Sequence, residues 1–200
     1  MMKNTEDQDM SKKDQILEAA LNLIKSEGFE KVTMRKIASE AHVNVGLVNY
    51  YFGTKNKLIN EVIQILVHSI RDSFTILDDH SMPPKERLKS FLTEYVKAYH
   101  QYPFIARQML EPHAVMFDSQ KEFVHFVKSI GLKKMQQTIE ELSGESDPEN
   151  LSIMTSHLLG AIFLPVLIEP LYEKVTGFQF PEENKRIALL LDRYFPDTEK

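Results

Sequence analysis

The stretch TMRKIASEAHVNVGLVNYYFGTK, residues 33–55, decides the fold of the N-terminal part of this chain. Thr33 is a good helix cap, and Ile37, Ala38 and Ala41 behind it form a narrow apolar face, which predicts a short helix over 34–41. Asn44 caps a second helix over 45–52, after a turn of only four residues. Two helices joined by so short a turn must cross steeply, which is the helix-turn-helix arrangement.

The sequence around this stretch predicts an all-α chain. Ser11 and Asp14 form a capping-box start for a helix that ends at Gly28, and Thr54 caps a long helix over 55–78. Further helices are expected over 85–102, 103–111, 120–142, 148–176 and 181–194. The sequence contains no alternating strand pattern. We therefore expect a three-helix N-terminal domain followed by a larger C-terminal helical domain.

The composition indicates in which cellular compartment the chain is expected. The chain has 200 residues and no cysteine, so disulfides, a thiol nucleophile and a Cys-based zinc site are excluded. Residues 1–10 are polar and lack the apolar run of a secretory signal. The longest apolar run, 158–168, is shorter than the roughly 20 residues that span a membrane. We expect a cytoplasmic protein without membrane contact, in which residues 158–168 form a buried helix.

Motifs for catalysis are missing from the sequence. It has no Gly-rich phosphate loop, no nucleophile elbow and no HExxH motif, and Glu111 with His113 are too few for a metal site. We therefore expect no enzymatic activity, no cofactor and no metal ion. A bundle that only binds other proteins is the alternative.

Charge and helix starts point to an anionic partner of the N-terminal domain. The net charge of −5 argues against nucleic acid. Residues 31–57, however, contain a single acid, Glu40, and five basic residues: Lys31, Arg35, Lys36, Lys55 and Lys57. Chance clustering is the alternative. The helices after Thr33, Asn44 and Thr54 also lack the acidic first turn that a helix dipole favours. Phosphate oxygens would satisfy all three helix starts, which predicts contact with DNA.

The same residues resemble the DNA-binding domain of the TetR family of bacterial repressors. The resemblance rests on Thr33-Met-Arg-Lys-Ile-Ala, Ala41-His-Val-Asn-Val-Gly46 and Asn49-Tyr-Tyr-Phe-Gly-Thr-Lys55 with Leu58, and it covers about residues 11–60. It implies a disordered tail over 1–10, a DNA-binding domain over 11–58, and a ligand-binding and dimerisation domain over 59–200. It also implies a homodimeric repressor that a small apolar effector releases from a palindromic operator.

The resemblance assigns roles to individual residues. Thr33 and Lys55 would hold phosphates, Arg35 would reach a base or a phosphate, and Gly46 would allow close approach to the backbone. The candidates for the major groove are Asn44, Val45, Leu47, Asn49 and Tyr50. The residues expected in the core are Val43, Val48, Tyr51, Phe52 and Leu58.

Two positions depart from the family pattern. His42 stands where the family usually has glycine, so we expect a slightly reshaped turn, because histidine tolerates a left-handed backbone less well. Asn49 stands where the family usually has tyrosine. Asparagine can bond adenine in a bidentate fashion or hold a phosphate, so the base preference cannot be inherited from relatives.

The C-terminal helices predict a dimer. Residues 151–172 are apolar on nearly all sides, so this helix is either central to its domain or shared with a partner. With the last helix it suggests an intermolecular four-helix bundle, and the resemblance implies the same. The expected interface residues are Leu158, Ile162, Ile187, Leu190, Leu191 and Tyr194.

Large side chains between these regions predict an effector cavity. At helical spacing such residues are more often core, and that alternative stays open. The candidates for lining the cavity are Phe91, Tyr95, Tyr99, Phe104, Met109, His113, Phe117, Phe126 and His157.

Overall fold

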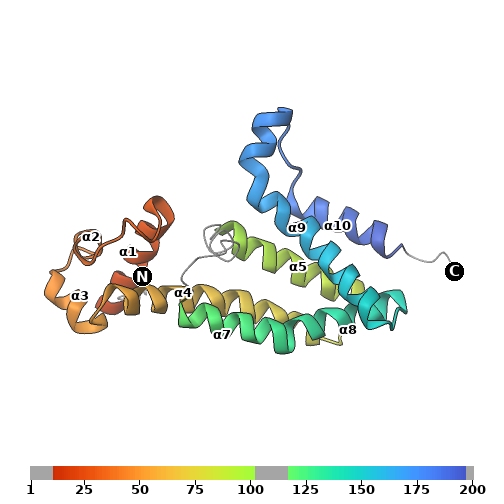
Figure 1. Cartoon of the computed structure of the whole chain (residues 1–200), viewed down its shortest axis with the longest axis horizontal. Coiled ribbons are helices and arrows are strands. Elements are labelled where there is room, and N and C mark those ends of the chain that lie inside the picture. The colour runs from red at the N-terminus through yellow and green to blue at the C-terminus, as the bar shows by residue number, and fades with distance from the viewer. Residues whose placement is uncertain (1–10, 102–116, 197–200) are drawn as a thin grey trace, which may run out of the picture. The chain divides into compact units, whose positions relative to one another are not determined.

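The computed structural model describes residues 11–101 and 117–196, and the secondary structure of these residues is entirely helical (Figure 1). The chain divides into two compact units, Met1–Ile65 and Leu66–Lys200. The division falls inside α4 (Lys55–Ser73), the helix in which the sequence also placed the domain boundary. The predicted all-α class is confirmed.

The first unit holds α1 (Lys12–Glu27), α2 (Met34–Glu40), α3 (Val45–Phe52) and the start of α4. The Ser11 hydroxyl accepts a hydrogen bond from the backbone N–H of Asp14 at 3.2 Å, and Gly28 with φ 81° ends α1. Both caps were predicted from the sequence. The buried core of this unit includes Ile16, Ala20, Ile24, Val32, Ile37, Val48, Phe52 and Leu58.

The second unit is built around α5 (Pro84–Gln101). This helix contacts the 3₁₀ segment η1 (Phe74–Asp78), α8 (Leu132–Ser143), α9 (Pro148–Thr176) and α10 (Glu183–Tyr194). Before α8 come α7 (Asp118–Phe126) and the π-helical segment η2 (Val127–Gly131). The expected helix over 103–111 lies outside the described residues.

Two helices that the sequence predicts as continuous are interrupted in the structure. The helix expected over 55–78 turns into η1 after Ser73, and the helix expected over 120–142 contains η2. The two interruptions meet, because a Cβ atom on Gly131 would lie only 2.8 Å from Cε1 of Phe74. The aromatic ring therefore packs directly against backbone, in the space that a glycine leaves.

A buried charge ties η1 to the end of α8. Arg87 is only 1% exposed, and its guanidinium donates to the carbonyl oxygen of Leu77 at 3.2 Å and to Nδ1 of His80 at 2.7 Å. It also forms an ion pair with Glu141. Buried charges need partners of this kind, because an unpaired one would lose its hydration without compensation.

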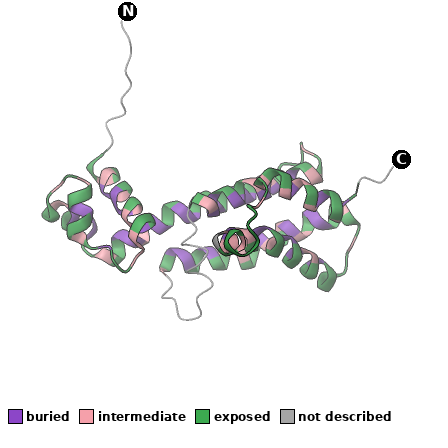
Figure 2. Ribbon diagram, turned by 90° about the horizontal axis from the view of Figure 1, so that it is seen from above, coloured by how far each residue is buried: buried purple, intermediate pink, exposed green. Residues whose placement is uncertain are grey.

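The apolar helix α9 is less buried than expected. Leu151, Thr155, Leu158, Ile162 and Val166 are buried, but none of the residues after Val166 whose burial the structure describes is buried (Figure 2). By length and composition Pro148–Glu169 could cross a membrane, a test that core helices of soluble proteins also pass, and 28% of an 18-residue apolar window within it is buried. The expectation that 158–168 is a buried helix is therefore wrong for one chain: a single side of α9 packs against the bundle.

Candidate nucleic-acid interface

The turn between α2 and α3 is a tight helix C-cap. The backbone N–H of His42 bonds the carbonyl of Ser39 at 3.2 Å, and that of Val43 bonds the carbonyl of Ala38 at 2.9 Å. This pair of bonds is the Schellman motif, which places a left-handed residue where His42 stands. His42 adopts that conformation itself, with φ 51°. The expected reshaping of the turn is therefore not seen, and the backbone strain remains in the turn.

Helix α3 presents one buried and one exposed face. Val48 and Phe52 are four residues apart and are both buried, so they fix the helix to the core of its unit. Val45, Asn49 and Tyr50 are exposed, and the Tyr50 side chain is 82% accessible. An exposed tyrosine of this extent has an aromatic face and a hydroxyl available for a partner.

Tyr51 is also available at the surface. The sequence predicts that it lies in the core, but Tyr51 is 39% exposed and its ring packs edge-on against Tyr50, with centroids 5.5 Å apart. The interior expectation for Tyr51 is therefore wrong. Helical periodicity did not reveal this, because Tyr51 lies at the border between the faces that Val48 and Tyr50 define.

Three helix N-termini of this unit are capped in the same way. Thr33 Oγ1 accepts from the N–H of Lys36 at 3.3 Å, Asn44 Oδ1 accepts from that of Leu47 at 2.8 Å, and Thr54 Oγ1 accepts from that of Lys57 at 3.3 Å. None of the three helices has an acid in its first turn. Each cap satisfies one of the four N–H groups that a helix start leaves free, so N–H groups and the positive end of the dipole stay available to an anion.

The basic side chains near these starts fall into two groups. Lys36 forms an ion pair with Glu27, and Lys55 Nζ donates to the backbone carbonyl of Glu30 at 3.3 Å. Arg35 and Lys57 are exposed, and no carboxylate of the described residues lies within ion-pair distance of either. The unpaired cations therefore stand in the first turns of α2 and α4.

Comparison with known proteins points to one family. Residues 16–62 match the family of bacterial regulatory proteins named tetR. This match lies within the N-terminal unit, and it supports a transcriptional regulator of the TetR family. A transcriptional regulator named BetI from Rhizobium meliloti is 32% identical over 77 residues, which is 38% of each chain, so the chain matches less than half of that relative's length. The probable regulator YttP of Bacillus subtilis is 25% identical over 87% of this chain and 86% of its own.

The fold likeness extends over the whole chain. A TetR-like regulator from Rhodococcus sp. RHA1 superposes with a TM-score of 0.66 at 19% identity, covering 92% of this chain and 93% of that one. The likeness therefore includes the C-terminal unit, for which the sequence alone gave only length and helical character. Members of the family are transcriptional regulators, which agrees with the expectation that the chain is not an enzyme.

In the C-terminal unit, some predicted effector residues form an aromatic cluster. The Phe74 ring packs against those of Phe91, Tyr95 and Phe126, with centroids 4.8 to 5.5 Å apart. Tyr95 and Tyr99 in turn contact Phe163. Phe74 and Phe163 cannot be singled out from the sequence, because both lie in segments that look like ordinary apolar helix.

Burial makes the hydroxyls of the two tyrosines in this cluster weaker acids than usual. Their hydroxyls share a hydrogen bond, and desolvation raises the pKa of Tyr99 to about 12 and that of Tyr95 well above its ordinary value. Both hydroxyls are therefore neutral at physiological pH, and together they form a small polar spot inside an apolar cluster.

Of the other predicted effector residues, the structure describes Phe117 and His157. Phe104, Met109 and His113 lie outside the described residues. Phe117 is half-buried at the N-cap of α7. His157 is exposed, and its Nδ1 lies 2.6 Å from the hydroxyl of Tyr194.

The expected interface residues divide in a similar way. Leu158, Ile162, Ile187 and Leu191 are buried inside one chain. Leu190 and Tyr194 are half-buried. The exposed apolar side chains of α9 are instead Ile153, Leu164, Leu171 and Val175, which are 45 to 73% accessible.

Proposed function

We propose that the chain is a DNA-binding transcriptional repressor of the cytoplasm that binds a palindromic operator as a homodimer and leaves it when a small apolar effector binds. The observation that carries the DNA-binding part is the set of three capped helix starts without first-turn acids around the exposed face of α3. An arrangement of this kind repels side-chain carboxylates and attracts phosphates.

The residue roles follow from these positions. Thr33, Arg35 and Lys55 would position the domain on the phosphate backbone. Asn44, Val45, Leu47, Asn49 and Tyr50 would meet the major groove, with Gly46 allowing close approach. In a helix-turn-helix the second helix enters the groove, and base edges select the sequence there.

The dimer is supported by the exposed stripe of α9. Ile153, Leu164, Leu171 and Val175 are spaced by 11, 7 and 4 residues, and these spacings bring all four to one face of an α-helix. An apolar stripe of this length is costly in water, and a second copy of α9 would cover it. We keep the predicted use of α9 and assign the contact to this stripe, since Leu158 and Ile162 pack inside one chain.

The effector part is supported by the aromatic cluster of α5 and its neighbours. Ring-lined regions with a few convergent polar groups are typical ligand sites, and the Tyr95 and Tyr99 hydroxyls supply those groups. An effector that binds better to the DNA-free form lowers the affinity of the protein for DNA. By linkage, DNA lowers the affinity of the protein for the effector by the same factor.

Selection from a random DNA pool tests the DNA-binding part. The chain should enrich a two-fold symmetric sequence, and Asn49→Ala and Tyr50→Ala should each change the enriched bases. Asn22→Ala, an exposed asparagine on α1, serves as the matched control and should leave the selection unchanged. Enrichment of the same sequence by all variants would contradict the groove assignment.

Sedimentation tests the dimer. Leu164→Glu should give monomers, because it would bury a charge in the apolar contact. Glu173→Lys changes a charge on the opposite side of α9 and should leave the dimer intact. A dimer that persists in Leu164→Glu would refute the stripe as the interface.

A further inference from the structure

The exposed face of α3 carries no charged side chain. The helix has the sequence VGLVNYYF, in which Val48 and Phe52 are buried and the remaining residues are exposed or half-buried. The commonest specific contact to DNA is a bidentate bond from arginine or lysine to guanine, and carboxylates accept from cytosine. No residue of α3 can make either contact. A helix of this composition therefore lacks the side chains that favour G·C pairs in the major groove.

Asn49 carries the single side-chain amide of α3, and this amide is free for a partner. It is exposed, and no group of the described residues bonds it. Asn44 differs, because its Oδ1 already accepts the backbone N–H of Leu47 at 2.8 Å as the cap of the helix. An amide presents a donor beside an acceptor, which matches the N6 amino group and N7 of adenine. The chemistry of Asn49 therefore favours adenine.

Apolar side chains flank this amide. Val45 lies one turn before Asn49 on the same side of the helix, and it is 39% exposed. Gly46 lies one turn before Tyr50, which is 82% exposed. Among the four bases, only thymine presents a C5 methyl group in the major groove. Val45 and Tyr50 offer this methyl group apolar contact, and Gly46 has no side chain to fill the space beside Tyr50.

The one arginine among residues 1–65, Arg35, lies outside α3. It is exposed in the first turn of α2. In a helix-turn-helix the first helix crosses the DNA backbone, whereas the second lies in the groove. A guanine contact by Arg35 would therefore fall at the margin of the half-site. The hydroxyl groups of Tyr50 and Tyr51 both donate and accept, so they discriminate little between bases.

We propose that the chain reads half-sites with A·T pairs at their centre, in which Asn49 bonds an adenine and Val45 and Tyr50 contact thymine methyl groups. The proposal rests on the proposed function, because it requires α3 to lie in the major groove, and it goes further by naming the base pairs. A different source of A·T preference is the narrow minor groove of A-tracts, which proteins read as DNA shape. That source involves neither the thymine methyl group nor adenine N7, so base analogues separate the two.

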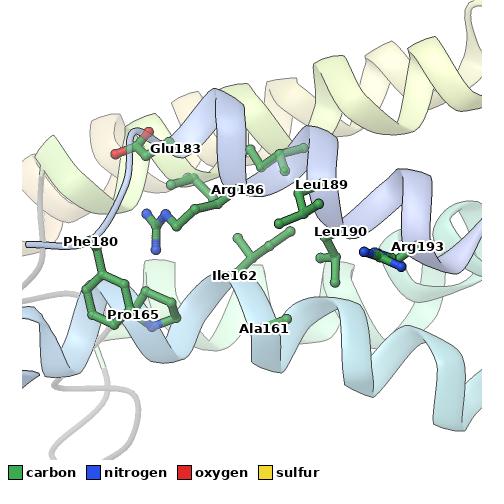
Figure 3. A pocket seen from close by; sticks show the side chains of 11 residues that line it. Ala161, Ile162, Pro165, Phe180, Glu183, Arg186, Leu189, Leu190 and Arg193 are labelled. Carbon is green, nitrogen blue, oxygen red and sulfur yellow. The ribbon is translucent and has the colours of Figure 1, made fainter.

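A symmetric dimer applies the same readout twice. Figure 3 shows Ile162, Leu189 and Leu190 around an apolar groove between α9 and α10, the two helices from which the sequence predicts the dimer. A second copy that covers this apolar surface is related to the first by a two-fold axis, as in most homodimers. Each copy then brings one α3 to the DNA. The operator is therefore expected to be an inverted repeat with A·T pairs at the centre of both half-sites.

Base analogues test the proposal on the full chain, in the duplex that selection from a random pool enriches. Deoxyuridine in place of one thymine removes the C5 methyl group, and 7-deazaadenine in place of one adenine removes the N7 acceptor. Both analogues keep the Watson–Crick pairing. In fluorescence anisotropy, at least one deoxyuridine position should lower the affinity about three- to fivefold, as expected for one lost methyl contact. At least one 7-deazaadenine position should lower it about fivefold, as expected for one lost hydrogen bond.

Variants assign each contact. Asn49→Ala should bind the 7-deazaadenine duplex and the unmodified duplex equally well, because the bond is already lost. Val45→Ala or Tyr50→Ala should lose the sensitivity to deoxyuridine at one position in the same way. Asn22→Ala, at the exposed asparagine of α1, should keep every sensitivity of the wild type. In a second selection, Asn49→Arg should enrich guanine where the wild type enriches adenine, because arginine bonds guanine.

Two results would overturn this proposal alone. One is enrichment of a half-site with G·C pairs at its centre. The other is an A·T-centred half-site whose affinity is unchanged by every deoxyuridine and 7-deazaadenine substitution, which would assign the preference to DNA shape. A chain that enriches no sequence at all would instead refute the proposed function, and this proposal with it.

Discussion

The salt dependence of DNA binding gives a quantitative test of the unpaired cations. Lys57 stands in the first turn of α4, is exposed, and has no carboxylate partner in the described structure. If its ammonium neutralises one phosphate, Lys57→Ala should reduce the slope of log affinity against log salt by about 0.9. Between 50 and 200 mM salt, a fourfold range, the affinity ratio of wild type to variant should then shrink by roughly 3.5-fold.

Lys36 is the matched control for this measurement. Its side chain is already paired with Glu27 in the free protein, so a phosphate must compete with that carboxylate. Removing Lys36 also leaves Glu27 unpaired near the DNA. We therefore expect Lys36→Ala to weaken binding, but to change the slope less than Lys57→Ala does, because the Lys36 charge was compensated before binding.

Fluorescence anisotropy with a labelled random-sequence duplex is the assay, since phosphate contacts do not depend on sequence. Each variant is titrated at several salt concentrations, and its fold is checked by circular dichroism. An unchanged slope for Lys57→Ala would place this side chain away from the phosphates. Equal slope changes in both variants would show that the Lys36 pair with Glu27 does not survive in solution.

Three further predictions concern the scaffold. Gly131→Ala should lower the free energy of unfolding by about 1–3 kcal/mol in urea titrations, because its Cβ would clash with Phe74. His42→Gly should raise it by up to about 1 kcal/mol, because glycine adopts the left-handed conformation without strain. Because burial raises the pKa of Tyr99 from its ordinary value near 10 to about 12, stability should fall as pH rises from 10 to 12. Absorbance at 295 nm that shows every tyrosine ionising near pH 10 in the folded protein would contradict this.

The sequence predicted how the helices of the N-terminal unit begin. Ser11, Thr33 and Asn44 are caps because their short polar side chains can reach an N–H two or three residues ahead, and the structure shows all three bonds. Capping bonds of this kind can be predicted from the sequence, because they depend only on residues a few positions apart. The position of the turn at His42 was predicted correctly, but its shape was not. The sequence predicted a reshaped turn, whereas the fold imposes the left-handed conformation that histidine disfavours.

The C-terminal unit could be predicted only in outline. The 3₁₀ turn at Phe74 and the π turn ending at Gly131 depend on each other, and no local pattern marks a contact between residues 57 positions apart. The burial of Arg87 escaped prediction for the same reason, since its partner Glu141 lies in another helix. Helical periodicity places residues on faces, but tertiary packing decides which face is buried.

For helix α9, the inability to predict the buried face from the sequence also affects the prediction of the dimer interface. Because α9 is apolar on nearly every side, its sequence does not determine which side packs inside the chain and which meets a partner. Packing against the bundle places Leu158 and Ile162 inside and leaves Leu164 outside. The two α9 residues that the sequence assigns to the dimer, Leu158 and Ile162, therefore lie on the side that the chain's own core takes. Once that side is occupied, the remaining stripe is the part of α9 that a second chain can cover, and Leu164→Glu tests it more directly than any substitution of the buried leucines, which would unfold the chain as readily as separate the dimer.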